Sequence, residues 1–71
     1  MYRLTERGEA YSKFFQEFLE ENLLTQGYVP NETKVTIGTL WTIEDTGEIP
    51  PSSEYMNKAW ELMNKGYIEE I

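Results

Sequence analysis

The absence of cysteine is the feature that most restricts how this chain can fold. With 71 residues, it is close to the size limit at which a hydrophobic core alone offsets the conformational entropy lost on folding. Without thiols, neither a disulfide nor a thiolate-bound metal can add to that core. The core must therefore come from large apolar side chains, including two Trp, five Tyr and three Phe. We expect a single domain over residues 1–71.

Two segments have the spacing of amphipathic helices. Over residues 6–26, apolar side chains recur every three or four positions, and Thr5 is placed to cap the start. A second helix is expected after Pro50-Pro51, where either Ser52 or Ser53 can accept a hydrogen bond from the first free backbone amides. The apolar residues of this second helix are Tyr55, Met56, Ala59, Trp60, Leu62 and Met63.

The two expected helices have matching C-terminal sequences. Leu23 to Val29 and Leu62 to Ile68 share the order Leu, apolar residue, two polar residues, Gly, Tyr and a β-branched residue. This order suits a Schellman cap, in which the glycine adopts the left-handed conformation. We therefore expect the helices to end at Gly27 and Gly66 and to turn sharply into extended segments.

Residues 33–44 alternate in the manner of a β-strand, with β-branched side chains favouring one strand or two short strands separated by a bulge at Gly38. The Asp-Thr-Gly sequence at 45–47 is a turn signal. Two extended pieces, Tyr2 to Leu4 and Tyr67 to Ile71, are expected to join the central strand. The predicted fold is α+β: two amphipathic helices packed on a small, mainly antiparallel three-stranded sheet, in the order β-α-β-α-β.

Charge and hydropathy restrict the surroundings of the chain. Thirteen acidic and six basic residues give a net charge of −7, which repels phosphate backbones and anionic membrane surfaces. No segment approaches the roughly 20 apolar residues that span a bilayer, and the first residues lack the apolar run of a signal peptide. We therefore expect a cytoplasmic protein, with nucleic acid a disfavoured partner and no membrane partner.

The sequence contains no recognisable catalytic or metal-binding set. Without His and Cys, the usual general bases, activated nucleophiles and transition-metal ligands are missing. Asp45-Thr46-Gly47 is the tripeptide of the aspartic proteases. In that family two carboxylates share a proton in a site that excludes water, whereas here the neighbours Glu44 and Glu48 add negative charge. A carboxylate-based enzyme would need a deep pocket lined by two acids. We expect no enzymatic activity, no catalytic residues, no cofactor and no metal.

The favoured function is a non-enzymatic protein-binding module of regulatory, adaptor or inhibitor type. Its partner is expected to be another protein or a second copy of the chain as a homodimer. Exposed aromatic residues are typical anchors of such interfaces. Packing of Trp41 on Trp60 in the core is the competing and more ordinary interpretation. The residues predicted to contact a partner are Leu40, Trp41, Tyr55 and Trp60.

Two segments resemble parts of winged-helix regulators. Tyr2 to Ala10, with the sequence Tyr-Arg-Leu-Thr-Glu-Arg-Gly-Glu-Ala, resembles their outgoing wing strand and the start of the following helix. Leu62 to Glu69 is similar to the end of their recognition helix and the first wing strand. The family has these segments in the opposite order. The resemblance therefore implies a permuted chain in which residues 2–4 pair beside residues 67–71.

The same resemblance implies an alternative function, a winged-helix-like DNA-binding regulator. A helix that reads a DNA groove needs a basic face. The second helix, however, offers Lys58 and Lys65 together with Glu54 and Glu61. Near the N-terminus, the residues expected to form a local basic patch are Arg3, Arg7 and Lys13.

Overall fold

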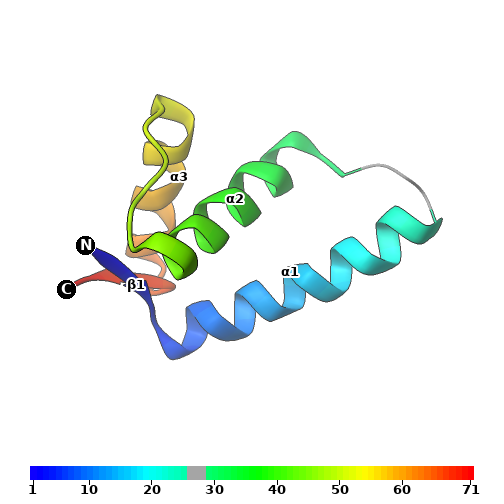
Figure 1. Cartoon of the computed structure of the whole chain (residues 1–71), viewed down its shortest axis with the longest axis horizontal. Helices are drawn as coiled ribbons and strands as arrows, with labels where there is room; N and C mark the ends of the chain where they lie inside the picture. The colour runs from blue at the N-terminus through cyan, green and yellow to red at the C-terminus, as the bar shows by residue number, and fades with distance from the viewer. Residues whose placement is uncertain (26–28) are drawn as a thin grey trace.

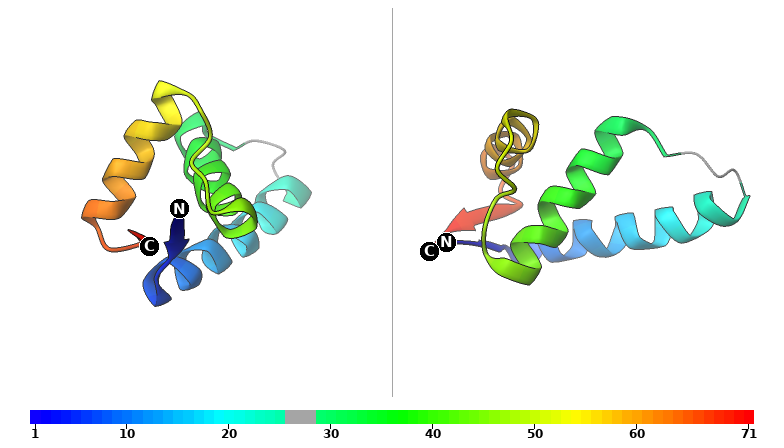
Figure 2. Two further views of the ribbon diagram at one scale, coloured as in Figure 1. Left: turned by 60° about the vertical axis from the view of Figure 1, so that its left-hand side comes forward. Right: turned by 45° about the horizontal axis from the view of Figure 1, so that its top comes forward.

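The computed structural model places three helices and two short strands in the order β1 (Tyr2–Leu4), α1 (Glu6–Thr25), α2 (Asn31–Thr46), α3 (Ser53–Asn64) and β2 (Ile68–Glu70). It describes residues 1–25 and 29–71. Figure 1 shows α2 between α1 and α3, and the two termini side by side at one end of the molecule. Figure 2 shows the same arrangement from two further directions. The described part of the chain is therefore mainly helical.

The predicted α+β fold, with two helices on a three-stranded sheet, is wrong. Residues 33–44 belong to α2 and do not form a strand, and Gly38 lies inside this helix and not at a bulge. The order of elements is β-α-α-α-β in place of β-α-β-α-β. The sheet of the described residues has two strands.

Two features explain why this β-branched segment forms a helix. Thr36 and Thr39 donate their hydroxyl hydrogens to the carbonyl oxygens of Glu32 and Val35, at 2.9 and 2.8 Å, so these polar groups are satisfied within α2. In addition, α2 contacts α1, α3 and β1. A helix buried on several sides loses the simple apolar stripe by which a helix is recognised in a sequence. The buried residues of α2 are Val35, Thr36, Ile37, Thr39, Leu40 and Ile43.

The two terminal segments pair with each other, as the resemblance implies, but the expectation that both join a central strand is wrong because residues 33–44 are helical. The strands are antiparallel, with Tyr2 opposite Glu70 and Arg3 opposite Glu69. Because side chains alternate along a strand, Tyr2 and Glu70 share one face of the sheet. On the other face, Arg3 and Glu69 form an ion pair of 2.6 Å. The Tyr2 amide also donates to the Gly47 carbonyl oxygen at 2.8 Å, which joins β1 to the end of α2.

The predicted N-caps of α1 and α3 are confirmed. The Thr5 hydroxyl oxygen accepts a hydrogen bond from the Gly8 amide at 3.1 Å, and the same hydroxyl donates to the Gly66 carbonyl at 2.6 Å. At the start of α3, the Ser52 hydroxyl accepts from the Tyr55 amide at 3.3 Å. Both α1 and α3 therefore begin where a hydroxyl satisfies an amide that has no partner within the helix.

The glycine at the end of α3 behaves as predicted. Gly66 has a φ of 81°, and the Tyr67 amide donates to the Leu62 carbonyl at 2.9 Å, which is the bond that defines a Schellman cap. Gly27, the predicted stop of the first helix, lies outside the described residues. The Asp-Thr-Gly sequence at 45–47 forms the last turn of α2 and its cap, with Gly47 at a φ of 77°.

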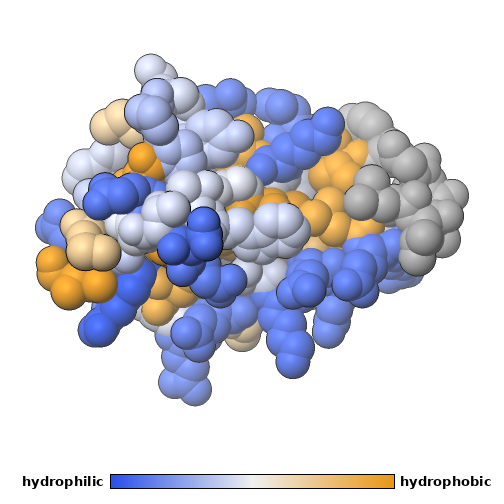
Figure 3. All heavy atoms as spheres, in the orientation of Figure 1, coloured by the Kyte–Doolittle hydropathy of each residue, from blue (hydrophilic) through white to orange (hydrophobic). Residues whose placement is uncertain are grey.

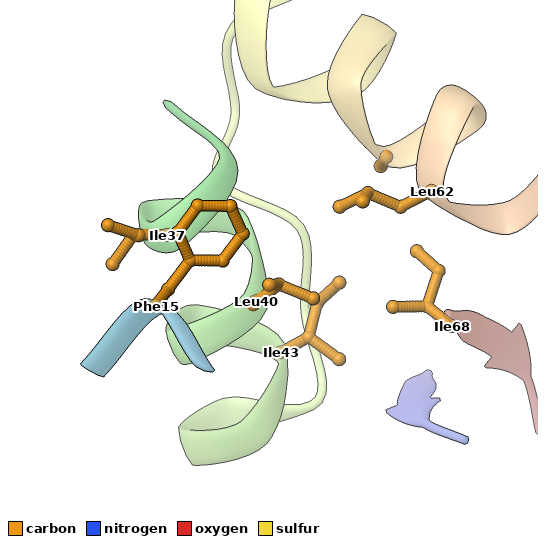
Figure 4. Packing of buried hydrophobic residues seen from close by; sticks show 7 residues of the cluster. Phe15, Ile37, Leu40, Ile43, Leu62 and Ile68 are labelled. Carbon is orange, nitrogen blue, oxygen red and sulfur yellow. The ribbon is translucent and has the colours of Figure 1, made fainter. Parts of the chain in front are cut away.

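The core lies where α1, α2, α3 and β2 meet. Figure 4 shows Leu40 and Ile43 of α2 pointing toward Leu62 of α3 and Ile68 of β2, and Phe15 of α1 beside Ile37. Full burial of one such side chain stabilises the folded state by about 1.5–3 kcal/mol. The short strand β2 is therefore held by core packing as well as by its hydrogen bonds.

Candidate functional site

A groove of about 300 Å³ lies between α3, the loop that precedes it and the sheet. We call it the α3 groove. Its lining residues are Tyr2, Ile49, Met56, Ala59, Trp60, Met63 and Glu70. Most of them are apolar, and Glu70 is the charged residue among them.

One wall of the α3 groove comes from a single face of α3. Met56, Trp60 and Met63 are spaced by four and then three residues, which places them on the same side of a helix. Beneath them, Ala59 is buried in the core. Met56 and Trp60 nevertheless remain 52% and 62% exposed. α3 therefore exposes large apolar side chains that do not belong to the core.

The opposite wall comes from the sheet and from Ile49. Tyr2 and Glu70 are cross-strand partners, so their side chains lie next to each other on the face toward the groove. Tyr2 and Ile49 are both half-buried, whereas Glu70 is exposed. Among the described residues, the Glu70 carboxylate has no ion-pair partner. The groove thus combines apolar walls with an unpaired negative charge at its rim.

Two more apolar side chains are exposed at the ends of the two strands. Met1 precedes Tyr2, Ile71 follows Glu70, and both Met1 and Ile71 are exposed. Figure 3 shows hydrophobic atoms at the end of the molecule where the termini lie, while hydrophilic atoms cover much of α1. A group of neighbouring exposed apolar residues, unlike isolated ones, is typical of a contact surface.

The four residues predicted to contact a partner do not lie together. Trp60 lines the α3 groove. Trp41 is 39% exposed on α2, so the expected packing of Trp41 on Trp60 in the core is wrong. Tyr55 is half-buried, and its ring lies so close to Gly38 that a Cβ there would be 2.9 Å from it.

The placement of Leu40 requires a correction. Leu40 is among the residues predicted to contact a partner, but it is 0% exposed and belongs to the central apolar cluster. The reason is the change from strand to helix, which moves Leu40 to the buried side of α2. Leu40 therefore has no surface to offer a partner.

Sequence reasoning missed three parts of the groove, namely Tyr2, Ile49 and Glu70. The sequence does identify Met56 and Met63 as apolar residues of the second helix. Their spacing from Trp60 places all three on one face of that helix. Tyr2, Ile49 and Glu70 come from three separate parts of the chain, and no local pattern joins them. Only the antiparallel pairing of β1 with β2 brings Tyr2 and Glu70 together.

Lys58 lies on the side of α3 toward α2, Lys65 follows the end of α3, and both lysines are paired. Lys58 donates to Glu61 at 2.7 Å and to Glu32 at 3.3 Å, and Lys65 donates to Glu61 at 3.3 Å. Desolvation lowers the pKa of Lys58, but the hydrogen bonds and charges of the two glutamates outweigh it and raise the pKa above its usual value. The hydrogen bonds from Lys58 and Lys65 lower the pKa of Glu61. α3 therefore offers no unpaired lysine to a phosphate backbone.

The proposed basic patch of Arg3, Arg7 and Lys13 is partly occupied by internal contacts. Arg3 pairs with Glu69 at 2.6 Å. The guanidinium carbon of Arg7 lies 5.1 Å from the centre of the Tyr67 ring, in a cation–π arrangement. Lys13 is exposed on α1. Binding of a polyanion would compete with the Arg3 ion pair.

A second, wider hollow of about 410 Å³ lies beside β1, and three carboxylates line it: Glu9, Glu44 and Asp45. No group of three or more His, Cys, Asp or Glu in the described residues is arranged to hold a metal ion. Asp45 is exposed in the last turn of α2. The Asp-Thr-Gly sequence is therefore the end of a helix, and it is not placed as one half of a buried acid pair.

Comparison with known proteins assigns no family to the chain. No protein-family model, curated protein or solved structure matches it. Among the described residues, no helix has both the length and the apolar composition needed to cross a membrane.

Proposed function

We propose that this chain is a non-enzymatic, cytoplasmic protein-binding module that contacts its partner through the α3 groove. The observation that carries the proposal is the exposure of Met56 and Trp60 at a groove whose other wall is also apolar. Tryptophan beside a groove is a frequent anchor of protein interfaces. Methionine adapts its flexible side chain to the shape of a partner.

The second candidate is a winged-helix-like DNA-binding regulator. Its support is the pairing of β1 with β2, which the resemblance to that family requires. The net charge of −7 and the pairing of Lys58 and Lys65 with Glu61 oppose it. We therefore rank DNA binding below protein binding.

Site-specific photo-crosslinking tests the proposal. The photoreactive amino acid benzoylphenylalanine replaces Trp60 in one protein and Phe14 in a control, because Phe14 is also exposed but lies on α1. In cells that naturally contain the chain, we expect a discrete crosslinked protein from position 60 and none from position 14. Identical patterns from the two positions, or none from position 60, would refute the α3 groove as the contact surface.

The same experiment separates the forms of the proposal. A crosslink from position 60 to a second copy of the chain would identify a homodimer, and sedimentation at several protein concentrations would then show self-association. Crosslinking to duplex DNA in place of protein would favour the winged-helix alternative. A crosslink to another protein is the expected result.

A further inference from the structure

We propose that the occupant of the α3 groove is a cationic segment of another protein, which inserts a large apolar side chain into the groove and places a lysine or arginine beside Glu70. This inference rests on the proposed function. The inference adds to that function the charge and the apolar character expected of the partner. The argument uses the size of the groove, its apolar lining and the charge at its rim.

The size of the groove limits what can enter it. A volume of about 300 Å³ is at the lower end of the roughly 300–1,000 Å³ of small-molecule sites. An α-helix with its side chains is about 10–12 Å across. The groove therefore suits one or two large side chains from a segment that lies across it. Met56, Trp60 and Met63 supply the apolar contacts for such an anchor.

Glu70 determines the charge that the groove prefers. Its carboxylate has no ion-pair partner among the described residues and lies beside apolar walls. A lysine or arginine of the partner would form a charge-assisted hydrogen bond there, in surroundings that exclude part of the water. An acidic segment would be repelled both by Glu70 and by the net charge of −7.

The same charges disfavour a second copy as the occupant. Two copies would bring together net charges of −7 each. In a twofold dimer through the α3 groove, the same surface patch of both chains meets, so the unpaired Glu70 of each copy would be brought into one interface. A basic partner relieves this repulsion.

Three synthetic peptides labelled with fluorescein test the inference by fluorescence anisotropy. Their sequences are Lys-Lys-Leu-Phe-Lys-Lys, Glu-Glu-Leu-Phe-Glu-Glu and Lys-Lys-Ser-Ser-Lys-Lys. We expect the first to bind the full chain and the other two to bind at least about tenfold more weakly, since each lacks either the charge or the apolar anchor. Equal binding of the acidic peptide, or no binding of the first, would overturn the inference.

Variants separate recognition at the groove from attraction by net charge. Glu70→Gln should weaken binding of the first peptide about tenfold, because the charge-assisted bond is lost. Glu17→Gln removes the same charge from an exposed position on α1 and should leave binding unchanged. Equal weakening by both variants would show that net charge alone attracts the peptide, and would refute the role of Glu70. Circular dichroism verifies that both variants remain folded.

Trp60→Ala distinguishes failure of this inference from failure of the proposed function. If Trp60→Ala abolishes binding while Glu70→Gln has no effect, the groove binds apolar ligands and only its charge preference is wrong. If Trp60→Ala has no effect and position 60 gives no crosslink, the proposed function fails together with the inference.

Discussion

The first turn of α1 touches the backbone of the segment that leaves α3, because Gly8 lies directly against the carbonyl group of Tyr67. A Cβ at position 8 would overlap the Tyr67 carbonyl oxygen and would lie 2.9 Å from its carbon. That oxygen also accepts a hydrogen bond from the Thr5 amide at 3.0 Å. The start of α1 is thus held to the end of α3 by contacts that leave no room for a side chain at position 8.

This contact predicts that Gly8→Ala destabilises the protein. Helix propensity alone would make alanine about 1 kcal/mol more favourable than glycine within a helix. We expect instead a loss of at least about 2 kcal/mol in the free energy of unfolding, because backbone atoms must move apart. Urea unfolding followed by circular dichroism measures the difference. Glu9→Ala, at an exposed site in the same turn, should change stability by less than about 0.5 kcal/mol. A stabilised Gly8→Ala protein would contradict the contact.

The N-cap of α3 distinguishes two adjacent serines. Ser52 accepts a hydrogen bond from the Tyr55 amide, whereas Ser53 is exposed and is the first residue of the helix. Ser52→Ala should cost about 1 kcal/mol, and Ser53→Ala should have little effect. Thermal unfolding of the two variants makes the comparison. The reverse order of their melting temperatures would place the cap at Ser53.

Leu40 and Trp60 should respond differently to truncation. Leu40→Ala creates a cavity in the core and should lower the free energy of unfolding by about 2–5 kcal/mol. Trp60→Ala removes a side chain that is mostly exposed, so its cost should stay below about 1 kcal/mol. Urea unfolding measures both values. A large loss of stability in Trp60→Ala would mean that this residue serves the core and not a partner.

The cluster of Glu61 with Lys58 and Lys65 predicts a dependence of stability on acid. Folding lowers the pKa of Glu61 from its ordinary value of 4.5, so its stabilising effect is present above that value and is lost as the pH falls through the folded-state pKa. We therefore expect Glu61→Gln to be less stable than the parent protein near neutral pH, with a difference that shrinks in acid. Urea unfolding at a series of pH values tests this expectation.

A control for the acid experiment is Glu20→Gln, at an exposed position on α1. An equal pH dependence of the two variants would show that the effect comes from net charge and not from the cluster around Glu61. For Lys58 the sign is opposite, because its pKa is raised on folding and its contribution is lost only as the pH rises beyond 10.5. A difference for Glu61→Gln that grows in acid would contradict the ion-pair cluster.

Local chemistry made two of the three helices predictable from the sequence. The starts of α1 and α3 depend on Thr5 and Ser52, each of which bonds an amide three residues later. The end of α3 depends on Gly66 and on a bond between Tyr67 and Leu62. All of these partners are close in the chain, so a short window of sequence contains the whole interaction.

Tertiary packing determined that α2 is a helix and which residues line the α3 groove. The β-branched run at 33–44 fits an alternating strand, but it becomes a helix because contacts with α1, α3 and β1 bury it on several sides. The groove joins Tyr2, Ile49 and Glu70 to α3 across most of the length of the chain. Interactions between neighbours in sequence determine where a helix starts and stops. Burial depends on the elements that lie across the core, and it determines which segments become helices and which surfaces meet.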